Sequence, residues 1–209
     1  NVMIGGYAGT HWGNLNLRLG VSYVWNMLQT DRTVRFKGYQ GSKLNSSYLA
    51  GTAQAFGEVG YKIRRGQTVL EPFAQVAYVN VQANKFHETG GVEALRGRSM
   101  NTGVTFSSFG MRAASTFKVG SLFMTPQALL GYRHAFGHLS PTVRETFENG
   151  GDSTVMSISG APLASDTALL NLGFTVKATD QIDIGLSYIG QYGVQSVDSG
   201  ARAQVKITF

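Results

Sequence analysis

The 209-residue sequence contains no cysteine, only four prolines and no long apolar run. Without cysteine, the chain has no disulfide, no thiolate metal ligand and no cysteine nucleophile. No stretch approaches the roughly 18–20 consecutive apolar residues that a transmembrane helix requires. Glycine, in contrast, occurs 27 times. Many glycines and few prolines fit numerous strands joined by tight turns.

The C-terminal segment shows a strict alternation of side-chain type. Residues 201–209 have apolar side chains at every odd position and polar ones at every even position. A strand directs successive side chains to opposite faces, so one face is wholly apolar and the other carries Arg202 and Lys206. Such a strand, stopping on the aromatic Phe209, is typical of the closing strand of an outer-membrane β-barrel.

The same period-two alternation recurs along the chain and predicts nine strands. They cover residues 2–12, 14–28, 47–64, 68–86, 101–119, 121–146, 165–178, 181–194 and 199–209. Phe73 and Leu129 break the pattern, since each falls on the polar face of its strand. The connections alternate between short turns and longer polar loops, at 29–46, 87–100 and 147–164.

This organisation predicts an all-β fold, a transmembrane antiparallel β-barrel. Strands of soluble sandwiches average about 5–6 residues, whereas the predicted strands exceed the roughly 9–11 residues needed to cross lipid at a tilt. Alternating short turns and long loops are also typical of single-chain outer-membrane barrels. These barrels have an even number of strands, so nine strands predict at least one more before Asn1.

Aromatic side chains support the same fold, because membrane barrels carry aromatic girdles where the apolar band meets water. One group lies next to the short turns, and another lies toward the opposite strand ends. The predicted membrane-interface aromatics are Trp12, Tyr61, Tyr23, Trp25 and Tyr188.

The formal net charge of +6 arises largely from residues on the polar strand faces. An Arg or Lys facing lipid at the midplane costs roughly 2–4 kcal/mol, and a one-residue register slip moves several outward together. The charges predicted to face the lumen are Arg18, Glu58, Lys62, Glu71, Arg112, Arg133, Lys177, Asp183, Arg202 and Lys206. No stacking aromatics alternate with the basic residues, so we expect no nucleic-acid binding.

Four of these residues, Glu58, Glu71, Arg112 and Arg133, can form an ion-pair network in the lumen. One interpretation is that the network binds or positions a lumenal helix and an exported chain. The other is simple charge balance in a hydrated lumen. The first predicts slower export for Arg133→Ala, and the second predicts only mild destabilisation.

No catalytic or metal site emerges from the remaining polar residues. His134 and His138 are four residues apart, which on a strand places both on the outward face in a polar rim. A serine hydrolase needs a nucleophile bonded to an oriented base, and Ser140 near His134 has no clear third member. We therefore expect no enzyme activity, no metal and no cofactor.

Several short motifs stand out by their order and spacing: Gly57-Glu58-Val59-Gly60-Tyr61, Leu70-Glu71-Pro72-Phe73-Ala74, Ala77-Tyr78-Val79, Gly131-Tyr132-Arg133-His134-Ala135-Phe136-Gly137 and Val205-Lys206-Ile207-Thr208-Phe209. Across nearly the whole chain they resemble the β-domain (translocator) of type Va autotransporters. The resemblance implies a barrel of about twelve strands with a linker helix in its lumen. Residues 1–209 are then expected to lack about three N-terminal strands and that helix.

The resemblance also implies a function. The domain is expected to be integral to the bacterial outer membrane, among its lipid and lipopolysaccharide, and to be monomeric. There it exports its own N-terminal passenger to the cell surface by type V secretion. The barrel assembly machinery is expected to recognise the last strand through Val205, Ile207 and Phe209, although Gln204 stands where the common signal favours glycine.

Two alternatives remain from the sequence. A porin-like channel for small solutes needs a constriction, for which loop 147–164 is long enough. A surface adhesin could act through the loops 29–46 and 147–164. What lies upstream distinguishes them: a secreted passenger favours the translocator, and a signal peptide followed directly by three strands favours a channel.

Overall fold

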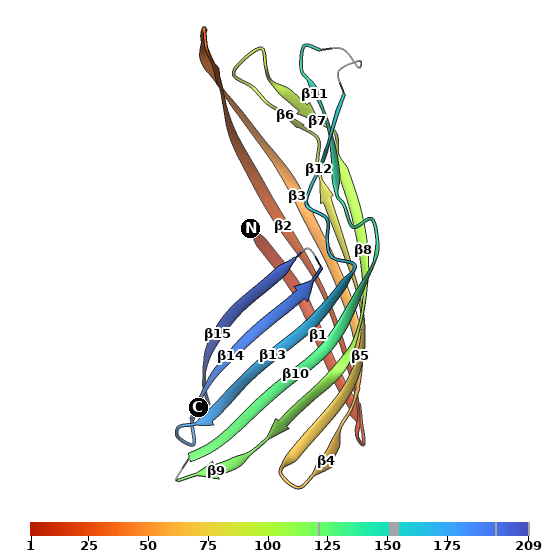
Figure 1. The fold of residues 1–209 in the computed structure, drawn as a ribbon, viewed down its shortest axis with the longest axis vertical. Coiled ribbons are helices and arrows are strands. Elements are labelled where there is room, and N and C mark those ends of the chain that lie inside the picture. The colour runs from red at the N-terminus through yellow and green to blue at the C-terminus, as the bar shows by residue number, and fades with distance from the viewer. Residues whose placement is uncertain (121, 151–154, 195, 209) are drawn as a thin grey trace.

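A computed structural model describes residues 1–120, 122–150, 155–194 and 196–208. In these residues, nine long strands form one antiparallel sheet in chain order, curved into an open half-barrel (Figure 1). They are β1 (Val2–Trp12), β2 (Leu15–Phe36), β3 (Tyr39–Tyr61), β5 (Thr68–Ala83), β8 (Met100–Ser115), β10 (Leu122–Gly137), β13 (Asp166–Lys177), β14 (Ile182–Gly193) and β15 (Val197–Ile207). The predicted all-β, nine-strand fold is confirmed.

Two short strands extend this sheet at its lower end, where the tight turns and the C-terminus lie (Figure 1). They are β4 (Ile63–Arg65), which pairs with β5, and β9 (Phe117–Val119), which pairs with β10. No helix in the described part of the chain is long and apolar enough to span a membrane.

The regular register separates the side chains into two sets. Directly paired residues share a face, as Arg18 does with Glu58 and Glu71 with Arg112. The polar set lies on the concave face of the sheet. The convex face exposes large apolar side chains, among them Leu19, Val21, Val76, Leu130 and Leu186. So continuous an apolar surface fits a lipid solvent rather than water.

The sheet is one layer thick and encloses little apolar core. Among the described residues, the buried apolar side chains are Leu44, Phe73, Ala94, Val104 and Ala135. Backbone ladders and polar contacts on the concave face therefore hold the strands together.

The prediction of a long loop at 29–46 was wrong. β2 and β3 continue as a hairpin through this segment, with a register shift only between Val34 and Phe36. On the convex face of β2, apolar side chains run from Leu15 to Met27 and polar ones begin at Gln29. Beyond the apolar band, neither face of a strand is required to be apolar. The parts of β2 and β3 within 29–46 therefore have the composition of a loop. The hairpin beyond Gln29 projects past this apolar band.

The loop predictions at 87–100 and 147–164 were also incomplete. Four short strands form a second sheet, which we call the rim sheet, in the order β12-β11-β7-β6. They are β6 (Phe86–His87), β7 (Leu95–Gly97), β11 (Thr142–Phe147) and β12 (Met156–Ser159). The predicted strand 121–146 instead ends at Gly137, whose φ of 114° takes the chain out of the extended conformation.

Candidate functional site

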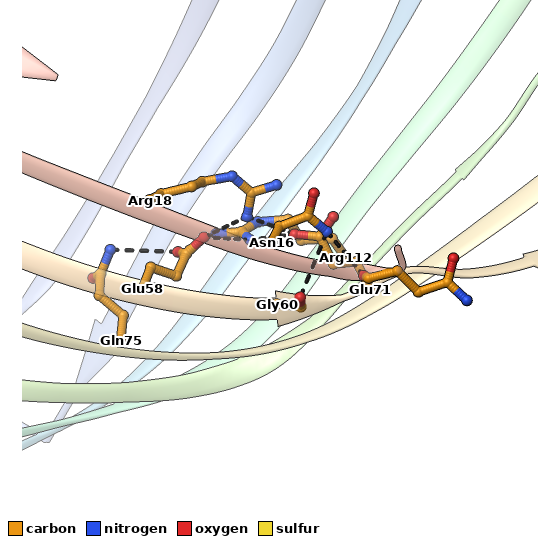
Figure 2. Close-up of polar contacts among 8 residues, drawn as sticks. Asn16, Arg18, Glu58, Gly60, Glu71, Gln75 and Arg112 are labelled. Carbon is orange, nitrogen blue, oxygen red and sulfur yellow. Dashed lines mark hydrogen bonds and ion pairs between the residues drawn. The ribbon is translucent and has the colours of Figure 1, made fainter. Parts of the chain in front are cut away.

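A buried ion-pair network joins four neighbouring strands on the concave face (Figure 2). Arg18 Nη1 lies 2.6 Å from both Glu58 Oε1 and Glu71 Oε1. Arg112 Nη2 lies 2.6 Å from Glu58 Oε2, and its Nη1 lies 3.2 Å from Glu71 Oε1. Glu58 and Glu71 are only 3% and 5% exposed. Each buried carboxylate thus has two guanidinium partners, which offset the loss of its hydration.

The strand register and one glycine create this arrangement. Gln75, the register partner of Glu58 on β5, donates from its Nε2 to Glu58 Oε2 at 3.4 Å. A Cβ at Gly60 would lie 2.6 Å from Glu71 Oε1. Glycine therefore leaves the space that the Glu71 carboxylate occupies. The motifs around Gly60 and Glu71, which lie on the paired strands β3 and β5, meet at one site.

The contacts of Phe73 explain why this aromatic residue lies on the polar face. The Arg112 guanidinium carbon is 4.0 Å from the centre of the Phe73 ring, a distance at which a cation–π contact forms. A Cβ at Gly110 would lie 3.0 Å from the same ring and 2.4 Å from the Leu130 carbonyl oxygen. The ring therefore covers Gly110 and supports Arg112 from below.

Arg133 does not join the network as the sequence predicted. Its Nη1 donates to Gln191 Oε1 at 3.1 Å, and its guanidinium carbon is 5.6 Å from the centre of the Phe106 ring. Arg18 occupies the position in the network that we had expected for Arg133. The sequence identified Arg18 only as one charge among ten, because nothing local showed that it reaches Glu71, 53 residues away.

A hollow of about 460 Å³ adjoins the network on the concave face. Its polar lining comes from Lys62, Glu71, Arg112, Gln127 and Asn171, with Leu129 among them. Within the described ranges, no group of three or more His, Asp or Glu side chains could hold a metal ion.

The other predicted lumen charges lie on the same face, nearer the C-terminal edge of the sheet. Asp183 lies between its register partners Lys177 and Lys206. Lys177 also pairs with Asp180 at 3.0 Å. Arg202 is paired in register with Ser187. These charges are spread along the sheet and do not contact the network.

The predicted interface aromatics lie on the convex face in two groups. Trp12 and Tyr61 lie at the lower end, and both are register partners of Leu15. Tyr23 and Trp25 lie higher, with ring centres 4.5 Å apart. Tyr188 lies on β14, and its hydroxyl is 2.5 Å from that of Tyr192. Trp12 is 62% exposed.

The predicted assembly signal lies on the edge strand β15. Val205 pairs with Ile184, and Ile207 pairs with Ile182. Val205 and Ile207 are exposed on the convex face. Phe209 is outside the described residues.

His134 takes part in a polar cluster on the convex face. Its Nδ1 lies 2.8 Å from Asp166 Oδ1, and the Tyr132 hydroxyl donates to the same carboxylate oxygen. His138 is exposed beyond the end of β10. The cluster involving His134 fits a polar rim above the apolar band.

An ion pair that the sequence did not reveal connects the long hairpin with the rim sheet. Arg32 donates to both oxygens of Glu88, at 3.0 and 2.5 Å. These bonds, with one from the Leu95 amide, lower the pKa of the buried Glu88 carboxyl. Burial and the Glu88 carboxylate raise the pKa of Glu145 nearby. The two partners, 56 residues apart, lie in segments predicted as loops.

Comparison with known proteins agrees with this architecture. The family described as "Autotransporter beta-domain" matches residues 1–189. Two proteins of Serratia marcescens, each named extracellular serine protease, are 30% identical to the chain over 203 and 200 residues. The alignments cover 97% and 96% of this chain but only 19% of either relative.

The chain thus spans about a fifth of the length of these curated relatives. A curved antiparallel sheet, apolar outside and charged inside, is the architecture expected of an outer-membrane β-barrel. Together with the family match over residues 1–189, it shows that the chain belongs to the autotransporter β-domain family.

Proposed function

We propose that this chain anchors in the bacterial outer membrane and enables export of an N-terminal passenger to the cell surface. The observation that carries this proposal is the separation of faces in a chain of this family. The convex face presents apolar side chains, while the concave face buries Glu58 and Glu71 among arginines. Such a wall can hold a hydrated path through lipid.

The aromatic groups support a defined position in the membrane. Trp12 and Tyr61 lie at the periplasmic interface, and Tyr23, Trp25 and Tyr188 lie at the outer one, against lipid and lipopolysaccharide headgroups. The ten lumen-facing charges line the path.

We propose further that the complete barrel has about three additional strands between β1 and β15 and a linker helix in the lumen. In support, the described residues pair β1 only with β2 and β15 only with β14. The barrel assembly machinery recognises the last strand through Val205, Ile207 and Phe209. The closed barrel is a monomer, and any enzymatic activity of the full protein belongs to the passenger.

The test is to place an epitope tag upstream of this segment in the full-length gene product and to treat intact cells with protease. Loss of the tag, with a barrel-sized fragment surviving, supports surface export. A protected tag in cells whose barrel is folded in the outer membrane contradicts translocation and favours the porin-like channel. A variant blocked in barrel assembly serves as the control for cell integrity, because its tag is not exported and must stay protected if the cells are intact.

A further inference from the structure

A hydrogen-bonded cluster lies on the convex face where the apolar band ends, near the end of β10 that is remote from the tight turns (Figure 1). Along β10, the convex side chains change from the apolar Leu130 to Tyr132 and His134. His134 is paired in register with Ser107 of β8 and with Asp166 of β13, so these side chains share one face. We call Tyr132, His134 and Asp166 the His134 cluster.

The Asp166 carboxylate determines which atoms of the cluster donate and which accept, because an ionised carboxylate can only accept. The Tyr132 hydroxyl donates to Oδ1, and Ser165 Oγ donates to Oδ2 at 2.7 Å. His134 Nδ1, 2.8 Å from Oδ1, therefore carries a proton, which leaves Nε2 of the neutral imidazole as an acceptor. Among the described residues, none bonds to this Nε2. The cluster thus presents acceptor atoms to its surroundings.

The strands around the cluster provide no basic partner for a phosphate on this face. The lysine and arginine residues of β5, β8, β10, β13 and β14 are Arg112, Arg133 and Lys177. All of them lie on the concave face, where Arg112 contacts Glu58 and Arg133 contacts Gln191. A phosphate binds through donors and cations, whereas a hydroxyl group can donate to the acceptors of the cluster.

Exposed aromatic rings flank these acceptors. The ring of Phe136 meets that of His134 edge to face, with ring centres 4.4 Å apart, and the rings of Phe109 and Tyr132 are 5.3 Å apart. Phe136 and Phe109 are 50% and 57% exposed. A sugar ring has apolar C–H faces and hydroxyl groups at its edge. An aromatic surface beside hydrogen-bond acceptors therefore matches a sugar.

Neutral polar side chains continue this surface on the convex face of β5 and β8. Asn80 Nδ2 donates to Asn101 Oδ1 at 2.7 Å, and Gln82 Nε2 donates to Asn80 Oδ1 at 2.9 Å. Gln82 and Asn101 are exposed. Amides both donate to and accept from hydroxyl groups, so this neighbouring surface has the same preference for uncharged polar partners.

We propose that the His134 cluster binds hydroxyl groups of the sugars in outer-leaflet lipopolysaccharide. This inference rests on the proposed function, which places the convex face in lipid. The position of the cluster favours a sugar that is attached to a lipid, because the acyl chains can then contact the apolar band at Leu130 while the sugar reaches His134. Hydrogen bonds to the headgroup layer oppose vertical displacement of the barrel in the membrane.

The experiment uses the full-length protein, extracted from the outer membrane in a mild detergent. It is incubated with rough lipopolysaccharide, which retains its core sugars, or with lipid A, which lacks them, and native mass spectrometry counts the molecules retained. We expect the wild type to retain rough lipopolysaccharide more strongly than lipid A. The double variant Tyr132→Phe with His134→Phe removes two polar groups but keeps the rings. It should lower the retention of rough lipopolysaccharide roughly fivefold or more.

The matched control is Tyr7→Phe with His11→Phe on β1, which also removes one hydroxyl and one imidazole. Tyr7 and His11 pair with Gly20 and Asn16 on the concave face, so the control should bind as the wild type does. Heat-dependent gel mobility verifies that each variant is folded.

Three results would overturn this inference and leave the proposed function intact. They are undiminished retention by the folded double variant, equal retention of lipid A and rough lipopolysaccharide by the wild type, and equally tight binding of core oligosaccharide freed from its lipid. The wild-type comparison of the two lipids tests the inference even if the double variant does not fold. Protease accessibility of the upstream tag tests the proposed function separately. If the wild type is absent from the outer membrane, both fail.

Discussion

Arg18 on β2 and Arg112 on β8 are separated by two strands, β3 and β5, yet both donate to Glu58 Oε1, at 2.6 and 2.9 Å. Both also donate to Glu71 Oε1. The network therefore ties four strands together across their ladders. Because the carboxylates are buried, removing one partner leaves a charge without compensation, which costs far more than the loss of a surface pair.

Glu58→Gln should lower the free energy of unfolding of the barrel by about 3 kcal/mol. The variant leaves Arg18 and Arg112 with one carboxylate between them. Thermal unfolding of the outer-membrane protein, followed by its gel mobility, measures the effect. Asp198→Asn removes a carboxylate from an exposed position and should change stability by less than about 0.5 kcal/mol. Equal unfolding temperatures for the two variants would contradict the prediction.

Arg133→Ala should destabilise the barrel independently of Glu58→Gln. Arg133 contacts Gln191 and Phe106 and shares no partner with the network. The two effects should therefore add to within about 0.5 kcal/mol in the double variant. Surface passenger yield, measured beside stability, distinguishes a role in export from charge balance. A strong non-additive coupling would place Arg133 in the network after all.

Gly110→Ala should destabilise the barrel by about 1–3 kcal/mol through overpacking. The new methyl would lie 2.4 Å from the Leu130 carbonyl oxygen and 3.0 Å from the Phe73 ring, displacing the ring from Arg112. Gly6→Ala is the control, since nothing lies within 4 Å of a Cβ there. The unfolding temperatures of the two variants test the prediction, and a Gly110 variant as stable as the Gly6 variant would refute it.

Leu130→Lys should impair membrane insertion, at a cost of roughly 2–4 kcal/mol. Leu130 is 67% exposed on the convex face of β10. Gln127, three residues away on the same strand, lies on the concave face, so Gln127→Lys should assemble normally. Quantifying folded protein in outer-membrane fractions compares them. Equal assembly would argue against a lipid-facing convex surface.

Glu145→Gln should stabilise the rim sheet at pH 7. Burial and the Glu88 carboxylate raise the pKa of Glu145, so its ionised form costs free energy that a neutral amide avoids. The gain should vanish as the pH falls through that raised pKa, because the wild-type carboxyl then becomes neutral. Hydrogen exchange of the Asn45 and Thr89 amides, which bond each other's carbonyls, reports the change.

The contribution of Glu88 to stability has the opposite pH dependence, so Glu88 serves as the comparison for Glu145. Arg32 lowers its pKa, so its stabilising contribution is present above the ordinary value of about 4.5 and is lost as the pH falls through the lowered pKa. Glu88→Gln should therefore speed exchange at pH 7, the reverse of Glu145→Gln. Identical behaviour of the two variants would contradict this assignment.

Much of the fold could be predicted because period-two alternation is a local property of each strand. The boundaries were least accurate outside the apolar band, where 29–46 looks like a loop although it continues β2 and β3. There, both strand faces meet water or other protein, and alternation is no longer required. Phe73, an apparent exception, became understandable only when Gly110 and Arg112 were found beneath and above its ring.

By itself, the sequence determined which side chains share a face, and hence which side of the wall is charged and which is apolar. The physical reason is that any other assignment of the alternating residues would place charges in lipid. Only the tertiary structure decided which charges meet. Arg18 rather than Arg133 reaches Glu71, and Arg32 reaches Glu88, because strand order, tilt and curvature set the distances between residues far apart in the chain.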